Sequence, residues 1–296
     1  MAAAQQIPLI DGVAALAPHY DGLILDLWGV LHNGQLPYPG VVDCLQRLKR
    51  AGKRLVILSN APRRIEAVIE RIGEIGIPPE AYDAVFTSGQ DTSQHLQSRG
   101  AATAEPFYRN LGPRCFHLGP DRDRGLMDDV PLEAVPQIAM ADFVLATGVL
   151  DRNDTLEQYE DRFQQMRAHR LPMICANPDL VVINAGRREL CAGAMAQRYE
   201  ELGGEVRYHG KPYASTYDEV FKLLPGIAKH RILAVGDSLR TDMAGAKAAG
   251  IDGLLILGGI HADEFSVAGQ SDAGRIAQAC SREGVAPVAA ALGFRW

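Results

Sequence analysis

Short apolar segments recur along this chain of 296 residues, and most of them end in a small or polar residue. They lie at residues 23–26, 55–60, 84–88, 143–147, 173–177, 232–237 and 254–257. Their hydrophobicity is continuous rather than alternating, which is typical of strands buried on both faces of a parallel sheet. A membrane span would need about 20 consecutive apolar residues, and none of these segments approaches that length.

Helical patterns lie between the apolar segments. Apolar residues recur at the spacing of one helix face in two stretches, namely Val41, Leu45 and Leu48, and then Ile65, Val68, Ile69, Ile72 and Ile75. Strands that alternate with helices of this length form βαβ units. We therefore expect an α/β fold with a doubly wound parallel sheet.

Three of the predicted strands end in residues that can take part in catalysis. Asp26 ends the first strand, and Ser59 with Asn60 ends the second. Asp237 ends a later strand. Ligands of open parallel sheets bind beyond the carboxyl ends of the strands, where the following loops meet. These side chains are therefore predicted to form one site.

The distance along the chain between two of the chemically interesting residues indicates an insertion. Ser59 and Lys211 are 152 positions apart, whereas a βαβ unit takes only about 30 residues. The intervening chain has a strand–helix–strand pattern of its own, at 143–147, 154–168 and 173–177. We expect it to form a separate α/β unit rather than to add strands to the same sheet.

Four segments, in this order, resemble the four motifs of the haloacid dehalogenase (HAD) superfamily: Asp26 with the residues after it, Ser59, Lys211 between a glycine and a proline, and residues 236–242 (GDSLRTD). Capped class II members carry a large insertion between the second and third motifs. Residues 210–212 (GKP), 177–179 (NPD) and 236–242 resemble class IIA, which includes NagD, p-nitrophenyl phosphatases, and pyridoxal phosphate or phosphoglycolate phosphatases. The resemblance covers about residues 20 to 262.

The resemblance implies a division into domains. A Rossmannoid, HAD-like core would comprise residues 1–90 and 188–262, and residues 91–187 would form an inserted α/β cap of the C2 type. Residues 263–296 are expected to be a helical extension of the core, because 263–286 is largely helix-compatible and Pro287 then interrupts the pattern. The apolar tail after Pro287 would pack on the core or form a homodimer contact, and the sequence leaves both open.

The resemblance also implies a reaction and a metal ion. In the family pattern Asp26 is the nucleophile that forms an aspartyl-phosphate intermediate. Ser59 would donate a hydrogen bond to a phosphoryl oxygen, and Lys211 would stabilise the charge of the transferred group. Mg²⁺, which prefers oxygen ligands, would reduce the repulsion between this carboxylate and the phosphate. The implied activity is hydrolysis of a small phosphorylated metabolite.

Further residues take their expected roles from the same pattern. The implied Mg²⁺ ligands are Asp26, the backbone carbonyl of Trp28, Asp237, and Asp242 at the start of a helix from Met243. The implied substrate-binding residues are Asn60, Asn177 and Asp179, although residues 177–179 also have the composition of a common turn. His32 and Asn33 follow the first motif and fit either a substrate-facing role or a loop role.

Trp28 departs from the family pattern. Family phosphatases usually carry a second aspartate at this position, where it acts as general acid and base. A tryptophan cannot protonate a leaving alkoxide or activate water, and loss of a positioned acid–base group typically costs about 10²–10⁴-fold in rate. The departure bears on the reaction and its rate more than on the fold.

Three functions therefore remain open. The chain is expected to be a slow or substrate-restricted phosphatase, or a module that senses a phosphorylated metabolite with little turnover. Hydrolysis of a carbon–phosphorus or carbon–halogen bond is the third reading. Retention of Lys211, Asp237 and Asp242 argues for phosphate chemistry, because dehalogenation needs no metal.

The composition limits the classes of binding partner and the cellular compartment that we expect for this protein. The net charge of −6, from 30 basic and 36 acidic residues, disfavours a nucleic-acid partner, which needs a surplus of basic residues on one face. Five scattered cysteines without a C-x-x-C pair are typical of reduced thiols in a cytosolic protein. Residues 1–20 lack the basic stretch of a signal peptide. We expect a cytoplasmic location and no membrane partner.

Overall fold

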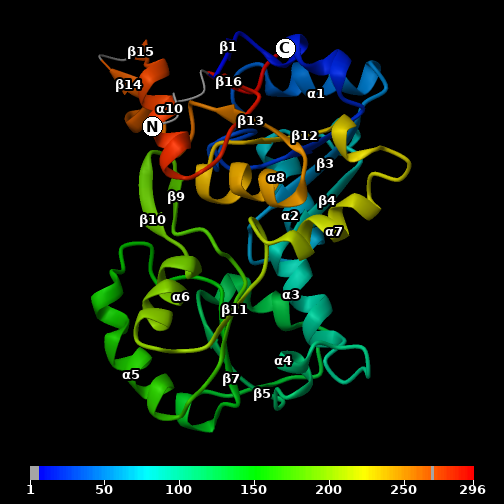
Figure 1. Cartoon of the computed structure of the whole chain (residues 1–296). Helices are drawn as coiled ribbons and strands as arrows, with labels where there is room; N and C mark the ends of the chain where they lie inside the picture. The colour runs from blue at the N-terminus through cyan, green and yellow to red at the C-terminus, as the bar shows by residue number, and fades with distance from the viewer. Residues whose placement is uncertain (1–6, 268–269) are drawn as a thin grey trace.

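The computed structural model describes residues 7–267 and 270–296, which form a large lobe and a small lobe (Figure 1). Residues 1–6 of the predicted core and residues 268–269 of the predicted C-terminal extension lie outside the described residues. Among the described residues, no helix is long and apolar enough to cross a membrane. All five cysteines lie in the described part of the chain, where they are buried and have free thiols.

A seven-stranded sheet forms the centre of the large lobe. Its order is β1 (Leu9–Ile10), β16 (Ala289–Ala291), β13 (Asp252–Ile256), β12 (Ile232–Gly236), β2 (Gly22–Leu25), β3 (Arg54–Ser59) and β4 (Ala84–Thr87). Every neighbouring pair in it is parallel. The predicted parallel strands at 23–26, 55–60, 84–88, 232–237 and 254–257 all lie in this sheet.

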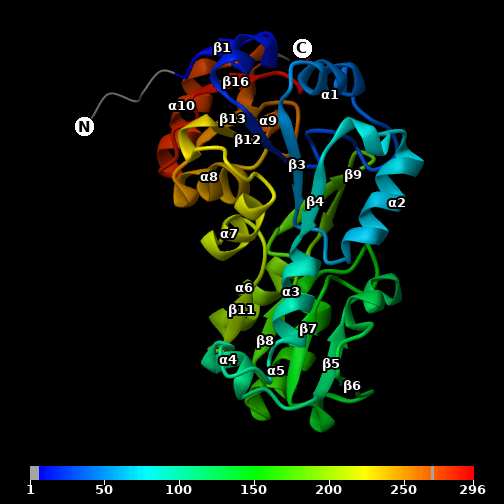
Figure 2. The same ribbon diagram turned by 90° about the vertical axis from the view of Figure 1, so that its right-hand side faces the viewer.

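Helices cover both faces of the large sheet (Figure 2). On one face lie α1 (Val41–Arg50) and α2 (Ile65–Ile75), and on the other lie α7 (Ala214–Lys222), α8 (Ala244–Ala249) and α10 (Ala273–Arg282). The short helix α9 (Ala262–Phe265) and the hairpin of β14 (Ser266–Val267) and β15 (Gln270–Ser271) precede α10. This arrangement is the predicted doubly wound α/β fold.

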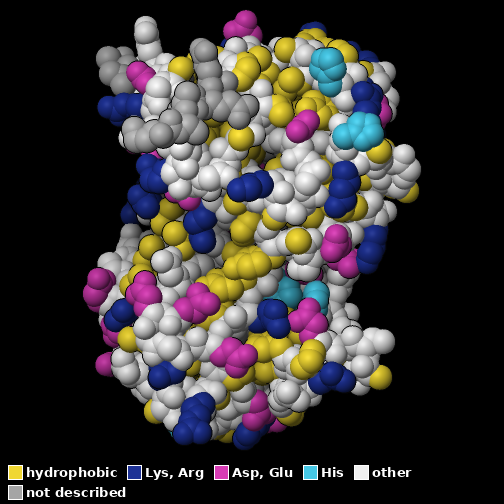
Figure 3. All heavy atoms as spheres, in the orientation of Figure 1, with side chains coloured by type: hydrophobic (Ala, Val, Ile, Leu, Met, Phe, Trp, Pro, Cys, Tyr) yellow, Lys and Arg dark blue, Asp and Glu magenta, His cyan; other side chains and the backbone are white. Residues whose placement is uncertain are grey.

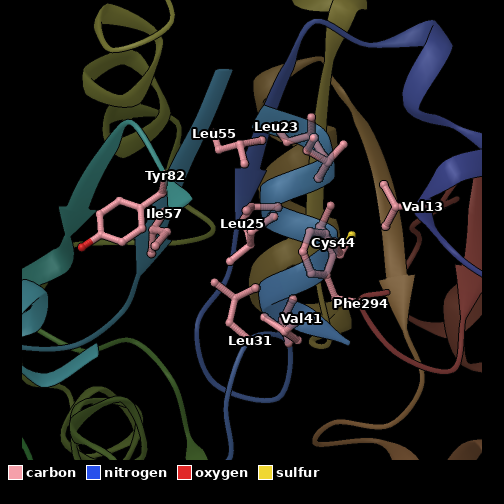
Figure 4. Close-up of a cluster of buried hydrophobic side chains, with 14 of the residues drawn as sticks. Val13, Leu23, Leu25, Leu31, Val41, Cys44, Leu55, Ile57, Tyr82 and Phe294 are labelled. Atoms are coloured by element: carbon pink, nitrogen blue, oxygen red, sulfur yellow. The ribbon is translucent and has the colours of Figure 1, made fainter. Parts of the chain in front are cut away.

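The helix α1 shows how the apolar pattern produces this packing (Figure 4). Its residues Val41, Leu45 and Leu48 are fully buried against the sheet, as their spacing predicts. Burying a large aliphatic side chain of this kind contributes about 1.5–3 kcal/mol. In α2 the prediction holds less well, because Ile69 is 38% exposed while Val68 and Ile72 face the core.

The small lobe is built on a separate five-stranded parallel sheet. Its order is β11 (Val206–Tyr208), β8 (Met173–Cys175), β7 (Phe143–Ala146), β5 (Arg114–Leu118) and β6 (Glu133–Ala134). α5 (Glu160–Ala168) and α6 (Ala192–Glu201) pack on one face, while α3 (Ser88–Gln97) and α4 (Pro106–Arg109) pack on the other. The inserted chain therefore forms its own sheet.

The chain returns to the large lobe later than the predicted boundary between residues 187 and 188. That boundary cuts the antiparallel hairpin of β9 (Val181–Asn184) and β10 (Arg187–Leu190). It also assigns α6 and β11 to the large lobe, although α6 packs on the small sheet and β11 pairs with β8. The prediction was wrong here because β10 and the short strand β11 lack the continuous apolar run that marks most of the other strands.

The C-terminal segment is also more than a helical extension. β16 inserts between β1 and β13 of the large sheet. Phe294 is buried in the same core as α1, whereas Leu292 and Trp296 remain 58% and 39% exposed. The strand was missed because its sequence is three alanines, which have strong helix propensity and only weak strand propensity.

Candidate active site

Two adjoining cavities lie between the lobes, at the carboxyl ends of β2, β3 and β12. Their volumes are about 440 and 480 Å³. Both are lined by Asp26 and Trp28 from the large lobe and by Asp179 and Val182 from the small lobe. The hairpin β9–β10 extends from the small lobe towards the large lobe and forms part of both walls (Figure 1). We call the combined space the cleft.

Three aspartates of the large lobe converge in the cleft and form what we call the carboxylate cluster: Asp26, Asp237 and Asp242. One carboxylate oxygen from each lies within 4.8 Å of those of the other two. Lys211 Nζ donates to Asp26 Oδ1 at 2.5 Å and to Asp242 Oδ1 at 2.8 Å. The structure thus brings together four of the residues predicted from the sequence, from segments that are far apart along the chain.

Adjacent parallel strands explain why two of these aspartates meet. Asp26 directly follows β2 and Asp237 directly follows β12, and these two strands are neighbours in register. Asp242 lies within a helical turn, Leu239–Met243, rather than before it. The predicted helix start at Met243 was therefore wrong. Ser238 is the N-cap residue instead, because its side chain accepts a hydrogen bond from the backbone of Thr241.

Burial and like charge shift the ionisation of the cluster. Burial raises the pKa of Asp26 to about 7, although the nearby Lys211 ammonium acts in the opposite direction. Burial, together with repulsion from Asp26 and Asp242, also raises the pKa of Asp237. Burial opposes the charge of Lys211, but the carboxylates of Asp242 and Asp26 hold its pKa well above its usual range. Additional positive charge would therefore stabilise the ionised carboxylates of this buried cluster.

Close backbone packing holds Asp237 in place. Gly29 has a φ of +77°, and a Cβ at this position would collide with the Asp237 carboxylate. The backbone N–H of Ile260 donates to Asp237 Oδ2 at 2.7 Å. Sequence reasoning missed Ile260, and the signal that could have found it is the pair of glycines directly before it, where β13 has ended.

Asn60 connects the small lobe to Lys211. Its side-chain amide donates to Asp179 Oδ1 at 2.9 Å and to the Lys211 carbonyl at 3.2 Å. Its Oδ1 accepts from the Lys211 backbone N–H at 2.8 Å. Burial raises the pKa of Asp179, although the charge of Lys211 opposes this effect. Asn60 therefore fixes the lysine backbone and the Asp179 side chain at once.

The other predicted site residues also border the cleft. Ser59 is buried, lines the first cavity, and its Oγ accepts from the Ala61 backbone N–H at 3.2 Å. Asn177 lines the same cavity, and its Oδ1 accepts from the Asp179 backbone N–H at 3.1 Å. That second bond forms the turn that the composition of residues 177–179 indicated.

Trp28 lines both cavities of the cleft. Its ring packs edge-on against the ring of His32, with centroids 4.9 Å apart. Burial, with the charge of Arg71, lowers the pKa of His32 to about 4, and its Nδ1 accepts from the Gly34 backbone N–H. In the neutral tautomer that accepts at Nδ1, the proton is on Nε2, which can therefore act as a hydrogen-bond donor. His32 lines the first cavity, so the substrate-facing reading is the one its position favours.

The residues present fit a hard divalent cation. The carboxylate cluster offers only oxygen ligands, which Mg²⁺ prefers. Three carboxylates opposed by one ammonium leave negative charge uncompensated in a buried place. Among the described residues, no backbone N–H donates to the carbonyl of Trp28, so this oxygen is also available.

Comparisons with known proteins agree with this geometry. A family model described as haloacid dehalogenase-like hydrolase matches residues 23–133, and one described as HAD-hydrolase-like matches residues 208–276. A haloacid dehalogenase-like hydrolase from Brucella suis 1330 is 32% identical, with a TM-score of 0.82, and the match covers 96% of this chain and 99% of that one. The chain belongs to the haloacid dehalogenase-like hydrolase family.

More distant HAD relatives have more specific names. A 4-nitrophenylphosphatase from Schizosaccharomyces pombe is 26% identical over 83% of this chain and 86% of that protein. A glycerol phosphate phosphatase from Mycobacterium tuberculosis, solved in complex with calcium, is 24% identical with a TM-score of 0.61. That match covers 83% of this chain and 68% of that one, and it shows a shared fold. The resemblance seen in the sequence motifs is thereby confirmed at the level of the family.

Proposed function

We propose that this HAD-family protein is a magnesium-dependent hydrolase of phosphate monoesters that acts on a small phosphorylated metabolite. The observation that carries the proposal is the convergence of Asp26, Lys211, Asp237 and Asp242 in a cleft between two lobes. The phosphatase names of the relatives support the same reaction class.

Asp26 would act as the nucleophile. Its Oδ1 is held by Lys211, and no hydrogen bond from the described residues reaches its other oxygen. Attack by a carboxylate oxygen on phosphorus forms an acyl phosphate as the phosphorus–oxygen bond to the leaving group breaks. Water then attacks the acyl phosphate, so that inorganic phosphate leaves and the Asp26 carboxylate is restored.

The charged neighbours would stabilise the transferred group. Mg²⁺ held by Asp26, Asp237, Asp242 and the Trp28 carbonyl would supply positive charge against the phosphoryl oxygens. Lys211 lies beside the nucleophile and would contact a phosphoryl oxygen, and Ser59 would donate a further hydrogen bond. These are the interactions through which phosphoryl transfer is mainly catalysed.

The small lobe would act as the cap. It begins within α3, after β4, and ends at β11, so we propose about residues 91–208 as the cap in place of the shorter segment expected from the sequence. Its loop at residues 177–179 and its hairpin β9–β10 line the cleft. We propose that Asn177 and Asp179 contact the part of the substrate that is not transferred, together with Asn60 from the large lobe.

Trp28 would restrict the range of substrates. Attack at phosphorus remains feasible, but the residue two places after the nucleophile cannot donate a proton to the leaving oxygen. A phenolate leaves without this help far more readily than an alkoxide, since phenols have much lower pKa values. We therefore expect p-nitrophenyl phosphate to be turned over, and most sugar phosphates to be turned over weakly.

A sensor of phosphorylated metabolites is the second candidate, and Trp28 is the observation that favours it. Such a protein would keep the Mg²⁺ and phosphate contacts while turnover is negligible. Carbon–halogen hydrolysis has no comparable support, because it leaves the carboxylate cluster and Lys211 without a role.

The test is phosphate release from p-nitrophenyl phosphate, an acyl phosphate and a matched alkyl phosphate, each with Mg²⁺ and with a chelator. We expect Mg²⁺-dependent turnover of the first two. Calorimetry of the parent and of Asp237→Asn should show Mg²⁺ binding that the substitution weakens at least about tenfold, since even residues that only orient metal ligands contribute 10–100-fold. Mg²⁺ and phosphate binding without turnover would support the sensor instead. Undiminished Mg²⁺ binding in Asp237→Asn would place the metal elsewhere.

A further inference from the structure

A second buried group of potential metal ligands lies outside the cleft, and we call it the junction cluster: Asp91, His95 and His209. Asp91 and His95 are one helical turn apart on α3, which leaves the large sheet after β4. His209 lies on the returning segment, between β11 and Lys211. The cluster therefore joins the two chain segments that cross between the lobes (Figure 2).

The spacing of the junction cluster fits metal coordination. Asp91 Oδ2 lies 2.9 Å from His209 Nδ1, and Asp91 Oδ1 lies 3.3 Å from His95 Nδ1. One ligand atom from each residue lies within 4.8 Å of those of the other two. A tetrahedral ion with bonds of about 2.0–2.1 Å separates its ligand atoms by about 3.3 Å. An ion could therefore be bound with only small shifts of the side chains.

An unpartnered oxygen is the independent observation. Asp91 is fully buried, and among the described residues its Oδ1 is the buried side-chain atom that lacks a hydrogen-bond partner. A buried carboxylate oxygen without a partner is costly, whereas a bound cation satisfies it. The oxygen lies 3.3 Å from His95 Nδ1, which is itself hydrogen-bonded to the Asp91 backbone carbonyl at 2.9 Å. An ion bound between this oxygen and this nitrogen would use the unpartnered oxygen and take the place of that hydrogen bond.

Neighbouring side chains orient the proposed ligands, as the outer contacts of metal sites commonly do. Tyr108 Oη is hydrogen-bonded to His209 Nε2, and Thr216 Oγ1 donates to Asp91 Oδ2 at 3.2 Å. In the tautomer that donates Nε2–H to Tyr108, His209 Nδ1 presents a lone pair towards the Asp91 carboxylate. Such outer contacts fix the orientation of metal-binding histidines.

The donor set and the access route indicate the kind of ion. Two imidazoles and one carboxylate suit a first-row transition metal such as Zn²⁺ rather than Mg²⁺ or Ca²⁺, which prefer oxygen ligands. His95 is 29% exposed and borders a cavity of about 150 Å³ with Tyr108 and His209. Histidine side chains reach the surface at the level of α3 in Figure 3. An ion and a water as fourth ligand have room to enter here.

We propose that Asp91, His95 and His209 bind a divalent transition-metal ion of the Zn²⁺ type, separate from the magnesium site. The ion fastens α3 to the returning segment two residues before Lys211. Asn60 holds the backbone of Lys211 through two hydrogen bonds. The ion and Asn60 would therefore both help to fix the position of the lysine. The role of the ion is structural, and the proposal does not depend on the reaction carried out in the cleft.

The test uses the full-length protein, stripped with a chelator and kept in millimolar Mg²⁺. Titration with Zn²⁺ is followed by calorimetry, and Co²⁺ is added separately to record its visible absorption. We expect one Zn²⁺ per chain and a Co²⁺ spectrum of nitrogen and oxygen ligands. His95→Gln should weaken Zn²⁺ binding more than Tyr108→Phe, which keeps all three ligands and should cost about 10–100-fold. The partly exposed His95 is chosen because its replacement disturbs the core least.

Asp237→Asn is the matched control, since it alters the carboxylate cluster and leaves the junction cluster intact. It should bind Zn²⁺ as the parent does. Absence of Zn²⁺ binding in the parent would overturn the proposal, as would equal binding by the parent and His95→Gln. Loss of Zn²⁺ binding in Asp237→Asn alone would also overturn it, because the ion would then occupy the cleft.

Discussion

The large lobe and the small lobe contribute to the cleft in different ways. The large lobe presents Asp26 and Asp237 directly at the ends of adjacent parallel strands, so the register of the sheet sets their separation. The small lobe presents Asp179 from a loop held by a turn and by a hydrogen bond to Asn60. Groups on strand ends are positioned by many backbone hydrogen bonds, whereas the loop depends on a few side-chain contacts.

This difference indicates that the two lobes have different roles in the proposed reaction. The rigid sheet edge would hold the groups that react with phosphorus, which must be placed accurately. The small lobe would select the substrate through the residues that it contributes to the cleft. Substitutions in the large lobe should therefore affect the reaction itself, and substitutions in the small lobe should have smaller effects that depend on the substrate.

The largest expected effect is that of Asp26→Asn. An amide cannot act as the nucleophile, so kcat for p-nitrophenyl phosphate should fall by at least about 10⁴-fold, as for other catalytic nucleophiles. Steady-state rates measure this, and retained melting temperature shows that the fold is intact. A loss below tenfold would mean that another group attacks phosphorus and that the sheet edge does not have the role assigned to it.

The next effect concerns Trp28→Asp. Placing a carboxyl two positions after Asp26 should raise turnover of an alkyl phosphate by up to about 10²–10⁴-fold, which is the usual contribution of a positioned acid–base group. Turnover of a matched aryl phosphate should rise much less. The ratio of the two rates in each variant is the measurement. If the parent already hydrolyses the alkyl substrate at about 10 s⁻¹, near the median of enzymes, another residue supplies the proton.

A smaller effect is expected in the small lobe. Asp179→Asn keeps the shape of the side chain but removes the charge that faces Asn60 and Lys211, and kcat should fall by about tenfold or less. The loss should differ between substrates, unlike that of Asp26→Asn. Glu189→Gln on β10 is a useful comparison, since Glu189 also lines the cleft but does not bond to Asn60. If Asp179→Asn lowered kcat for every substrate by as much as Asp26→Asn, the two lobes would not have the different roles that we assign to them.

The same contrast explains what could be predicted from the sequence. The strands of the large sheet that carry the site are continuous apolar runs, and Asp26, Ser59 and Asp237 were found at their ends. The inserted unit was found from the long gap before Lys211. The strand ends were recognised because burial on both faces leaves a continuous apolar run, and the insertion was recognised because the gap is too long for a single βαβ unit.

What was missed has little periodic signal. Strand β10 is short, largely polar and partly exposed, and β16 consists of alanines, so neither resembles a buried strand. Asp91 and His95 have helical spacing on α3, but two polar residues one turn apart are common on solvated helices. Only the tertiary fold brings them to His209. The junction cluster therefore became apparent only in the structure, whereas the carboxylate cluster was recognised from the motifs that contain its residues.

The most direct test of the proposed chemistry is to trap the covalent intermediate. The parent protein is mixed with Mg²⁺ and p-nitrophenyl phosphate, quenched in acid during turnover, and digested for peptide mass spectrometry, with Asp26→Asn as the control. Because a tryptophan cannot activate water, we expect the acyl phosphate to accumulate and the phosphate to map to Asp26 in the parent alone. Turnover with no phosphorylated Asp26, together with activity retained in Asp26→Asn, would contradict the account.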